Sequence, residues 1–325
     1  MERPFQPLRR RFLQGATALA VTALAPGPHE ARAAGMGGVM TTVIDVDACD
    51  GCGACVRACR ARNLARVPLP VQPIPQPYPP GVRIQDWADR RDVTDCLTPY
   101  NWLYIQSCTV RTQGGLRKVF LPRRCMQCVN PPCVNLCPAA AARQRATGAV
   151  YIDENFCLGD GRCIRFCPWM IPRRQSGVGV YLHLAPRYLG NGQVFKCDYC
   201  EELIAQGQPP VCVAACPRKA QHFGPREEMF ALASELAQAR NGDIYGRTIN
   251  GGTNTLYVSS LLFRDIEVEL LRQDQIGVGR PSLRPAVPSM TRENDLLGTV
   301  LAAPFAGAAL ACLRLWRDSQ KGRRS

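Results

Sequence analysis

The spacing of its cysteines restricts this chain more than any other feature of the sequence. Residues 125–168 contain two runs of closely spaced cysteines, and each run ends in a Cys-Pro pair. The members of these runs are Cys125, Cys128, Cys133 and Cys137, followed by Cys157, Cys163 and Cys167. Asp160 stands where the later run lacks its second cysteine. Three thiols this close in sequence must come from one tight loop, so we expect each loop to wrap around a group that binds several sulfur atoms.

Two further runs flank this stretch. They consist of Cys49, Cys52, Cys55 and Cys59 on one side, and of Cys197, Cys200, Cys212 and Cys216 on the other. The spacing is that of bacterial modules with two iron–sulfur clusters, in which three cysteines of a run ligate one cluster and the fourth ligates the other. The second and third runs are close enough to form one compact module. The first and fourth runs are the remaining partners, so we predict an α+β fold in which the inner module is inserted into an outer module.

Disulfide bonds and zinc binding are the other common uses of clustered cysteines. The chain has 18 cysteines in 325 residues. Disulfide frameworks belong to short secreted chains and have no reason to repeat the C-x3-C-P spacing. Zinc ribbons use paired C-x2-C motifs without that spacing. The iron–sulfur interpretation is therefore favoured over both.

Cysteines and histidines outside the runs are a second source of metal or redox chemistry. Cys96 and Cys108 have no ligand spacing, so we expect buried free thiols, with a Cys96–Cys108 disulfide as the alternative. His183 and His222 are the only histidines outside the N-terminal leader. A haem or zinc site on these two histidines ranks well below the cysteine chemistry.

The formal net charge of +14 would ordinarily suggest a nucleic-acid partner. No basic stripe interleaved with aromatic residues appears, however. Four clusters with their thiolates would contribute a charge of roughly −8, and the excess of arginine largely offsets it. We therefore expect no nucleic-acid partner.

Residues 1–33 are predicted to be an export signal. A triple arginine at residues 9–11 is followed by an apolar run at residues 15–25 and by Ala31-Arg32-Ala33. This pattern is typical of a twin-arginine signal with cleavage after Ala33, and a Sec signal or a basic amphipathic start is the alternative. Because clusters are assembled in the cytoplasm, a loaded protein needs a route that exports folded chains. The mature protein is therefore expected on the periplasmic side of the cytoplasmic membrane.

Residues 296–313 are predicted to be a single C-terminal membrane anchor. They carry no charge and are bounded by Asp295 and Arg314, although their length is near the lower limit for spanning a bilayer. The residues after them are mostly basic, which fits a cytoplasmic tail. A helix that docks on a partner is the alternative.

Local patterns predict the remaining organisation. Residues 66–81 hold seven prolines and should form a surface segment like polyproline II. We expect strands at residues 41–46, 149–152 and 255–262, helices at 139–145, 227–239 and 265–273, and a loop or hairpin at 177–194. The expected domains are an outer module at residues 41–65 plus 190–225, a Pro-rich insertion at 66–118, an inner module at 119–175, and a wrapping segment and linker at 226–290.

Four such runs behind a twin-arginine signal resemble the periplasmic four-cluster ferredoxin-like electron-transfer subunits. These serve hydrogenase-2, polysulfide and tetrathionate reductases, formate dehydrogenase and related quinone-linked complexes. The expected anchor makes the chain most similar to the hydrogenase-2 subunit, and the resemblance covers residues 41–263. It implies two nested dicluster ferredoxin-like modules. It also implies a periplasmic catalytic partner (a hydrogenase, a molybdopterin enzyme or a multihaem cytochrome) and an integral membrane quinone-binding subunit.

The resemblance also implies which cysteines share a cluster, and we number the four expected centres. Centre 1 takes Cys49, Cys52, Cys55 and Cys216; centre 2 takes Cys197, Cys200, Cys212 and Cys59; centre 3 takes Cys125, Cys128, Cys133 and Cys167; centre 4 takes Cys157, Cys163 and Cys137. The first three should be [4Fe-4S]. Centre 4 should be [3Fe-4S], or [4Fe-4S] with Asp160 as a weaker oxygen ligand. In similar subunits of nitrate- and DMSO-reductase type, this cluster is nearest the quinone site and is [3Fe-4S] when its second cysteine is absent.

The resulting prediction for function is an electron-transfer subunit without a catalytic site of its own. The sequence contains no nucleophile elbow, phosphate loop or dinucleotide fingerprint. Two other functions stay open: an enzyme that uses an open iron beside Asp160, and a structural subunit whose clusters only hold the fold. The residues from Trp169 to Pro172 are expected to pack over a cluster.

Overall fold

The computed structural model of the chain describes residues 38–184 and 191–284. The predicted signal at residues 1–33 and the predicted anchor at residues 296–313 lie outside the described residues. Within the described ranges, no helix combines the length and the apolar character needed to cross a membrane.

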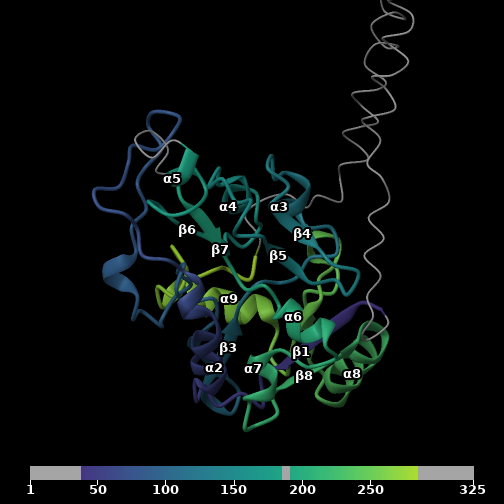
Figure 1. The fold of residues 1–325 in the computed structure, drawn as a ribbon. Helices are drawn as coiled ribbons and strands as arrows, with labels where there is room; N and C mark the ends of the chain where they lie inside the picture. Colours follow the sequence, from purple (N-terminus) through teal and green to yellow (C-terminus); the bar gives the residue numbers. More distant parts are fainter. Residues whose placement is uncertain (1–37, 185–190, 285–325) are drawn as a thin grey trace, which may run out of the picture. The chain divides into compact units, whose positions relative to one another are not determined.

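A four-stranded sheet joins segments from both ends of the described chain (Figure 1). Its strands, in spatial order, are β8 (Gln221–Pro225), β1 (Met40–Asp45), β10 (Thr255–Ser259) and β9 (Asp243–Tyr245). β1 runs parallel to β10 and antiparallel to β8. The strand predicted at residues 41–46 is confirmed, and every residue of β1 is buried because the sheet is covered on both faces. The strand predicted at residues 255–262 is confirmed but ends at Ser259.

Helix α8 (Arg226–Ala239) covers one face of this sheet and confirms the helix predicted at residues 227–239. Ala233 and Ala237 are one helical turn apart, so both lie on the face that is turned to the sheet. They pack against three buried strand residues, Val43, Leu256 and Val258. Small side chains at these two positions let the helix approach the sheet closely.

Helix α9 (Phe263–Arg272) confirms the helix predicted at residues 265–273. Its residues Phe263, Ile266 and Leu270 are buried, at the spacing of one helical face. α9 packs against a long hairpin formed by β2 (Tyr104–Thr112) and β3 (Gly115–Arg123). The sequence patterns above predict no element for this hairpin, although alternate residues of β2 are buried.

The Pro-rich segment at residues 66–81 contains no strand, and its only helical residue is the last of the 3₁₀ turn η1 (Leu64–Arg66). The segment is held by main-chain hydrogen bonds to distant residues, such as that from Val71 N to Gly177 O at 2.9 Å. A second 3₁₀ turn, η2 (Ala88–Arg90), follows it.

The inner cysteine runs lie among short helices and strand pairs. These elements are α3 (Pro132–Asn135), β4 (Ala142–Gln144), β5 (Val150–Ile152), α4 (Arg162–Arg165), β6 (Arg173–Gln175), α5 (Tyr181–Leu184) and β7 (Gln193–Phe195). β4 pairs with β5, β6 pairs with β7, and both pairs are antiparallel. The strand predicted at residues 149–152 is confirmed. Residues 177–194, predicted as a loop or hairpin, connect β6 to β7, and their described part contains the short helix α5.

The helix predicted at residues 139–145 is wrong. Ala140 has a φ of 50°, which a right-handed helix does not allow, and β4 begins two residues later. Ala142 pairs with Ile152, and Arg145 N donates to Ala149 O at 2.9 Å to close the hairpin. The alanine-rich composition is only a weak preference for helix, and pairing with β5 overrides it.

The outer runs are linked by α2 (Ala54–Asn63) and α7 (Val211–Ala214), which contact each other. The remaining elements are α6 (Glu201–Ala205) and the 3₁₀ turn η3 (Ile249–Gly251). β9 and β10, from the segment predicted to wrap the modules, complete the sheet that β1 and β8 begin.

Candidate metal centres

Centre 1 lies where β1 and β8 end beside each other. Because Ile44 is paired with Gln221, the loops after β1 and before β8 leave the sheet at the same end. The four cysteines that line the cavity between these loops are Cys49, Cys52, Cys55 and Cys216. The cavity contains about 300 Å³ of space that protein atoms do not fill, solvent at its mouth included. Cys52 is exposed, so this cavity lies at the protein surface.

Centre 2 is more deeply enclosed. Its cavity is lined by Cys59, Cys197, Cys200 and Cys212, all of them buried, and contains about 270 Å³ of unfilled space. Cys59 arrives from the last turns of α2, which pack against α7. Three side chains offer hydrogen bonds to the sulfur atoms: Arg124 Nη1 lies 2.7 Å from Cys212 Sγ, Asn63 Nδ2 lies 3.5 Å from Cys59 Sγ, and Gln127 Nε2 lies 3.9 Å from Cys197 Sγ.

Centre 3 brings the two inner runs together. Cys125, Cys128, Cys133 and Cys167 line a cavity with about 350 Å³ of unfilled space. Trp169, Ile171 and Pro172 line it too, so the segment expected to pack over a cluster does border this cavity. Lys196 Nζ lies 3.6 Å from Cys125 Sγ, and Ile171 N donates to Cys167 Sγ at 3.5 Å.

The cysteines of centre 4 lie in one group of packed apolar side chains. Cys157 and Cys163 are buried in it, and Cys137 packs against it. Val194 N donates to Cys157 Sγ at 3.4 Å. The same group of apolar side chains also contains Cys133 of centre 3, so the inner centres 3 and 4 are neighbours.

Asp160 is engaged elsewhere. Its Oδ1 accepts a hydrogen bond from Arg162 N at 3.1 Å and lies 3.5 Å from Arg162 Nε, at the start of α4. The carboxylate is 38% exposed. Its polar contacts among the described residues are therefore with the main chain and side chain of Arg162, and the structure shows it as a turn-forming residue.

Glycines let the loops approach their surroundings closely at two positions. Gly51 has a φ of 74°, and a Cβ there would overlap the ring of Phe120. Gly159 has a φ of 65°, and a Cβ there would overlap the carbonyl oxygen of Gly192. Any other residue would force both loops to move.

Cys96 and Cys108 are free, as is every other cysteine within the described residues. The Cys96–Cys108 disulfide alternative is therefore wrong. Cys108 is buried on β2 with its Sγ 3.9 Å from Ile266 O, and burial raises its pKa to about 11. Cys96 is half-buried, and burial raises its pKa as well.

His183 lies on α5 and His222 on β8. In the part of the chain that the structure describes, no three His, Cys, Asp or Glu side chains are grouped so that they could hold a single metal ion. A zinc ion needs ligand atoms about 2.0–2.3 Å away on all sides. The thiols of centres 1 to 3 instead surround cavities, which fits a larger group with several metal atoms.

The buried thiols are poor anions by themselves. Burial raises the pKa of Cys133 and of Cys55 to about 12, and that of Cys167 and of Cys200 to about 11. Metal coordination removes the proton of such thiols. Main-chain N–H groups aimed at Cys157, Cys167 and Cys216 are the kind of donors that tune iron–sulfur clusters. The residues present therefore fit iron–sulfur clusters.

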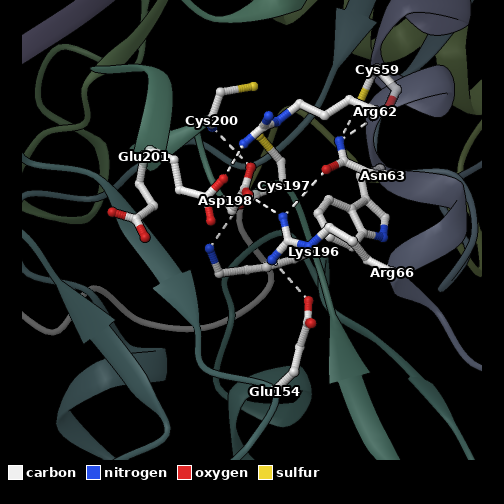
Figure 2. A network of polar contacts seen from close by, with 12 residues as sticks. Cys59, Arg62, Asn63, Arg66, Glu154, Lys196, Cys197, Asp198, Cys200 and Glu201 are labelled. Atoms are coloured by element: carbon white, nitrogen blue, oxygen red, sulfur yellow. Dashed lines mark hydrogen bonds and ion pairs between the residues drawn. The ribbon is translucent and has the colours of Figure 1, made fainter. Parts of the chain in front are cut away.

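A network of charged side chains ties the outer and inner runs together beside centre 2 (Figure 2). Arg66 Nη1 lies 2.5 Å from Asp198 Oδ2, and Arg66 Nη2 lies 2.9 Å from Glu154 Oε1. The same guanidinium lies over the Trp102 ring at 5.1 Å. Asp198 also accepts a hydrogen bond from Cys200 N at 2.8 Å. No sequence pattern indicates this network, because its members are far apart in the chain and have no shared spacing.

Comparison with known families agrees with the cysteine pattern. A family model described as a 4Fe-4S dicluster domain matches residues 116–226, and a second model of the same description matches residues 48–141. Together the two matches contain all four cysteine runs.

Curated relatives extend the similarity beyond these domains. The formate dehydrogenase-O iron–sulfur subunit of Escherichia coli is 33% identical over 223 residues, which are 66% of this chain and 65% of that protein. This chain thus spans just under two thirds of that relative. The formate dehydrogenase iron–sulfur subunit of Haemophilus influenzae is 30% identical over 276 residues, 83% of this chain and 77% of that protein. The hydrogenase-2 operon protein HybA of Escherichia coli O157:H7 is 27% identical over 315 residues, 84% of this chain and 87% of that protein.

The fold and the cysteine-lined cavities define a ferredoxin-like protein with tandem 4Fe-4S dicluster domains. The chain belongs to the family of iron–sulfur subunits that includes those of formate dehydrogenase and the protein HybA. The resemblance inferred from the four runs is thereby confirmed.

Proposed function

We propose that the chain relays electrons through four iron–sulfur centres, between a catalytic subunit and a quinone-binding membrane subunit of a periplasmic oxidoreductase complex. The observation that carries the proposal is the grouping of the cysteines. Three cavities are each lined by four cysteines, and in every case three come from one run and the fourth from its partner run. This is the ligand exchange of dicluster modules. The cysteines of centres 1, 2 and 3 are thus proposed to hold one [4Fe-4S] cluster each.

Centre 4 is proposed to hold a [3Fe-4S] cluster on Cys137, Cys157 and Cys163. The hydrogen bond and ion pair of Asp160 with Arg162 support this form, because they engage the carboxylate that would otherwise hold the fourth iron. Oxygen is also a harder ligand than thiolate and binds iron of a cluster less firmly. Fewer thiolates and one less iron are expected to raise the potential. A high-potential centre suits the end of the relay that faces the quinone-binding subunit.

The chain itself would shield the clusters from solvent, adjust their reduction potentials and offer surfaces to the partner subunits. Centres 2 and 3 lie among buried residues, which limits the solvent reorganisation that accompanies each electron. The N–H groups directed at sulfur stabilise the more negative, reduced state. Centre 1 reaches the surface at Cys52, and a partner subunit could approach it there. The similarity to a formate dehydrogenase iron–sulfur subunit and to a hydrogenase-2 operon protein supports a catalytic partner of the formate dehydrogenase or hydrogenase kind.

A coulometric titration of the purified chain under anaerobic conditions tests the proposal. We expect the chain to take up about four electrons, one for each centre, and to show no turnover of formate or hydrogen by itself. Turnover by the isolated chain would favour an enzyme with an open iron at centre 4. If a chain loaded with iron takes up no electrons, only a structural role is left for the clusters.

A further inference from the structure

Two basic side chains are buried at the junction between the outer and inner runs. Arg124 directly precedes Cys125, the first cysteine of centre 3, and Lys196 directly precedes Cys197 of centre 2. Arg124 is 1% exposed and Lys196 is 4% exposed. In sequence both look like ordinary surface charges beside a cysteine motif.

Each of these side chains contacts one centre, whereas the cysteine that follows it in the sequence belongs to the other centre. Arg124 lines the cavity of centre 2, where its Nη1 lies 2.7 Å from Cys212 Sγ. Lys196 lines the cavity of centre 3, where its Nζ lies 3.6 Å from Cys125 Sγ. The main chain of each residue is thus tied to one centre and its charged end to the other. Both charges must therefore lie in the space between centres 2 and 3.

Neither charge forms an ion pair with a carboxylate of the described residues. None of the ion pairs formed by residues 38–184 and 191–284 involves Arg124 or Lys196. Asp198, next to Cys197, is ion-paired with Arg66 instead (Figure 2). Nε and Nη2 of Arg124 have no hydrogen-bond partner among the described residues, and this guanidinium lies over the Tyr199 ring at 5.7 Å.

The remaining contacts of Lys196 are neutral. Its Nζ donates to Val150 O at 2.5 Å and to Cys197 O at 3.0 Å. A buried charge is costly unless an opposite charge compensates it. Among the described residues, the anions that act on both cations are the thiolates of centres 2 and 3 and the negative groups that those thiolates would hold. Asp198 also attracts Lys196, although its carboxylate is ion-paired with Arg66.

We propose that Arg124 and Lys196 are a crossed pair of positioning residues, whose charges set the potentials of centres 2 and 3 jointly and so govern electron transfer between the two modules. The inference rests on the proposed relay. An electron that passes between the modules oxidises one centre by one unit and reduces the other by one, and no proton or bond is exchanged. A positive charge near both centres favours the reduced state of each. Both midpoint potentials therefore rise together, and the difference between them stays small.

Single substitutions distinguish a joint effect on both potentials from an effect on one centre alone. We expect Lys196→Met and Arg124→Met each to lower the midpoint potentials of both centre 2 and centre 3, with centres 1 and 4 unchanged, in a redox titration followed by EPR. Lys196→Arg keeps the charge and should retain both potentials. Arg123→Met is the matched control, because Arg123 is equally buried but donates to Ser282 O at 2.8 Å and contacts no thiol. It should shift centres 2 and 3 much less.

The outcomes are distinct. Iron-loaded variants in which only one centre shifts, or in which neither shifts, would overturn the crossed pair while leaving the relay intact. A wild-type chain without iron would instead overturn the proposed function. If the methionine variants fail to bind iron, pulsed EPR of the wild-type chain with ¹⁵N-labelled lysine decides. A ¹⁵N coupling to reduced centre 3, removed in Lys196→Arg, is expected, and its absence would contradict the proposal.

Discussion

Cys49 and Cys216 line the same cavity although they stand at opposite ends of the cysteine series. The antiparallel pairing of β1 with β8 explains this, because Ile44 opposite Gln221 brings the two loops to the same end of the sheet. Cys59 meets Cys212 in the next cavity, through the contact of α2 with α7. Residues from the two flanking runs therefore build two cavities together, with the inner runs between them in sequence.

The contribution of Arg66 to stability can be measured separately from its neighbours. Replacing Arg66 by methionine leaves Asp198, whose side chain is 7% exposed, without its ion pair. We expect a loss of about 1–3 kcal/mol, reduced from the value for a fully buried pair because Arg66 is partly exposed. Thermal unfolding under anaerobic conditions should show a midpoint lowered by several degrees.

Arg62→Met is the control for that measurement. Arg62 pairs with Glu202 at 2.9 Å, but the Glu202 side chain is 67% exposed. Such pairs contribute about 0–1 kcal/mol. An equal loss of stability in both variants would contradict the bridging role of Arg66.

The Asp45–Arg240 ion pair predicts a pH dependence. Burial raises the pKa of Asp45, but the hydrogen bond and charge of Arg240, together with hydrogen bonds from the main-chain N–H groups of Asp47 and Ala48, lower it by more, so the folded-state pKa lies below the usual value. The pair's contribution is therefore complete above the unfolded pKa of about 3.9 and is lost only as the pH falls through the lower, folded value. We expect the stability difference between the wild type and Asp45→Asn to stay constant from about pH 8 to about pH 5. A difference that disappears within this window would show that the pKa is raised.

Replacing Asp160 by cysteine tests the form of centre 4. A thiol at this position restores the second ligand of the run, so we expect one additional iron per chain and loss of the oxidised [3Fe-4S] EPR signal. Asp160→Asn is the control and should keep that signal, because the carboxylate contacts Arg162 instead of the cysteines. A spectrum that Asp160→Cys leaves unchanged, or a signal that Asp160→Asn abolishes, would speak against three-cysteine ligation.

Removal of single thiols separates ligands from bystanders. Cys59→Ala should prevent a cluster from forming at centre 2, so that the chain holds about four fewer iron atoms and takes up one electron less. Cys108→Ala removes an equally buried thiol that lies on β2 and lines none of the three cavities described above. It should retain all the iron. Full iron content in both variants would show that Cys59 is not a ligand.

Sequence spacing predicted the chemistry better than it predicted the architecture. The four-cysteine sets that line the cavities are those that the family resemblance implied, and α8 and α9 lie where the local sequence predicted helices. The helix expected at residues 139–145 fails because cross-strand pairing with β5 outweighs alanine's preference. The β2–β3 hairpin was missed although Tyr104, Gln106, Cys108 and Val110 alternate as buried positions. Its polar Gln106 and its arginine and threonine residues concealed that alternation.

The burial of Arg124 and Lys196 had no sequence signal at all. A basic residue beside a cysteine is usually solvated, and only the packing of one module on the other encloses these two. The same holds for Arg66, whose partners Asp198 and Glu154 are far apart in the sequence. Charges at a junction between modules become visible only when the junction itself is known.

Quantification of iron and acid-labile sulfide in the anaerobically purified full-length chain, combined with EPR of the oxidised and reduced protein, tests the central claim most directly. The account predicts about 15 iron atoms per chain, one [3Fe-4S] signal in the oxidised state and three [4Fe-4S] signals on reduction. A colourless, iron-free protein, or one whose run cysteines are joined to each other as disulfides, would contradict it.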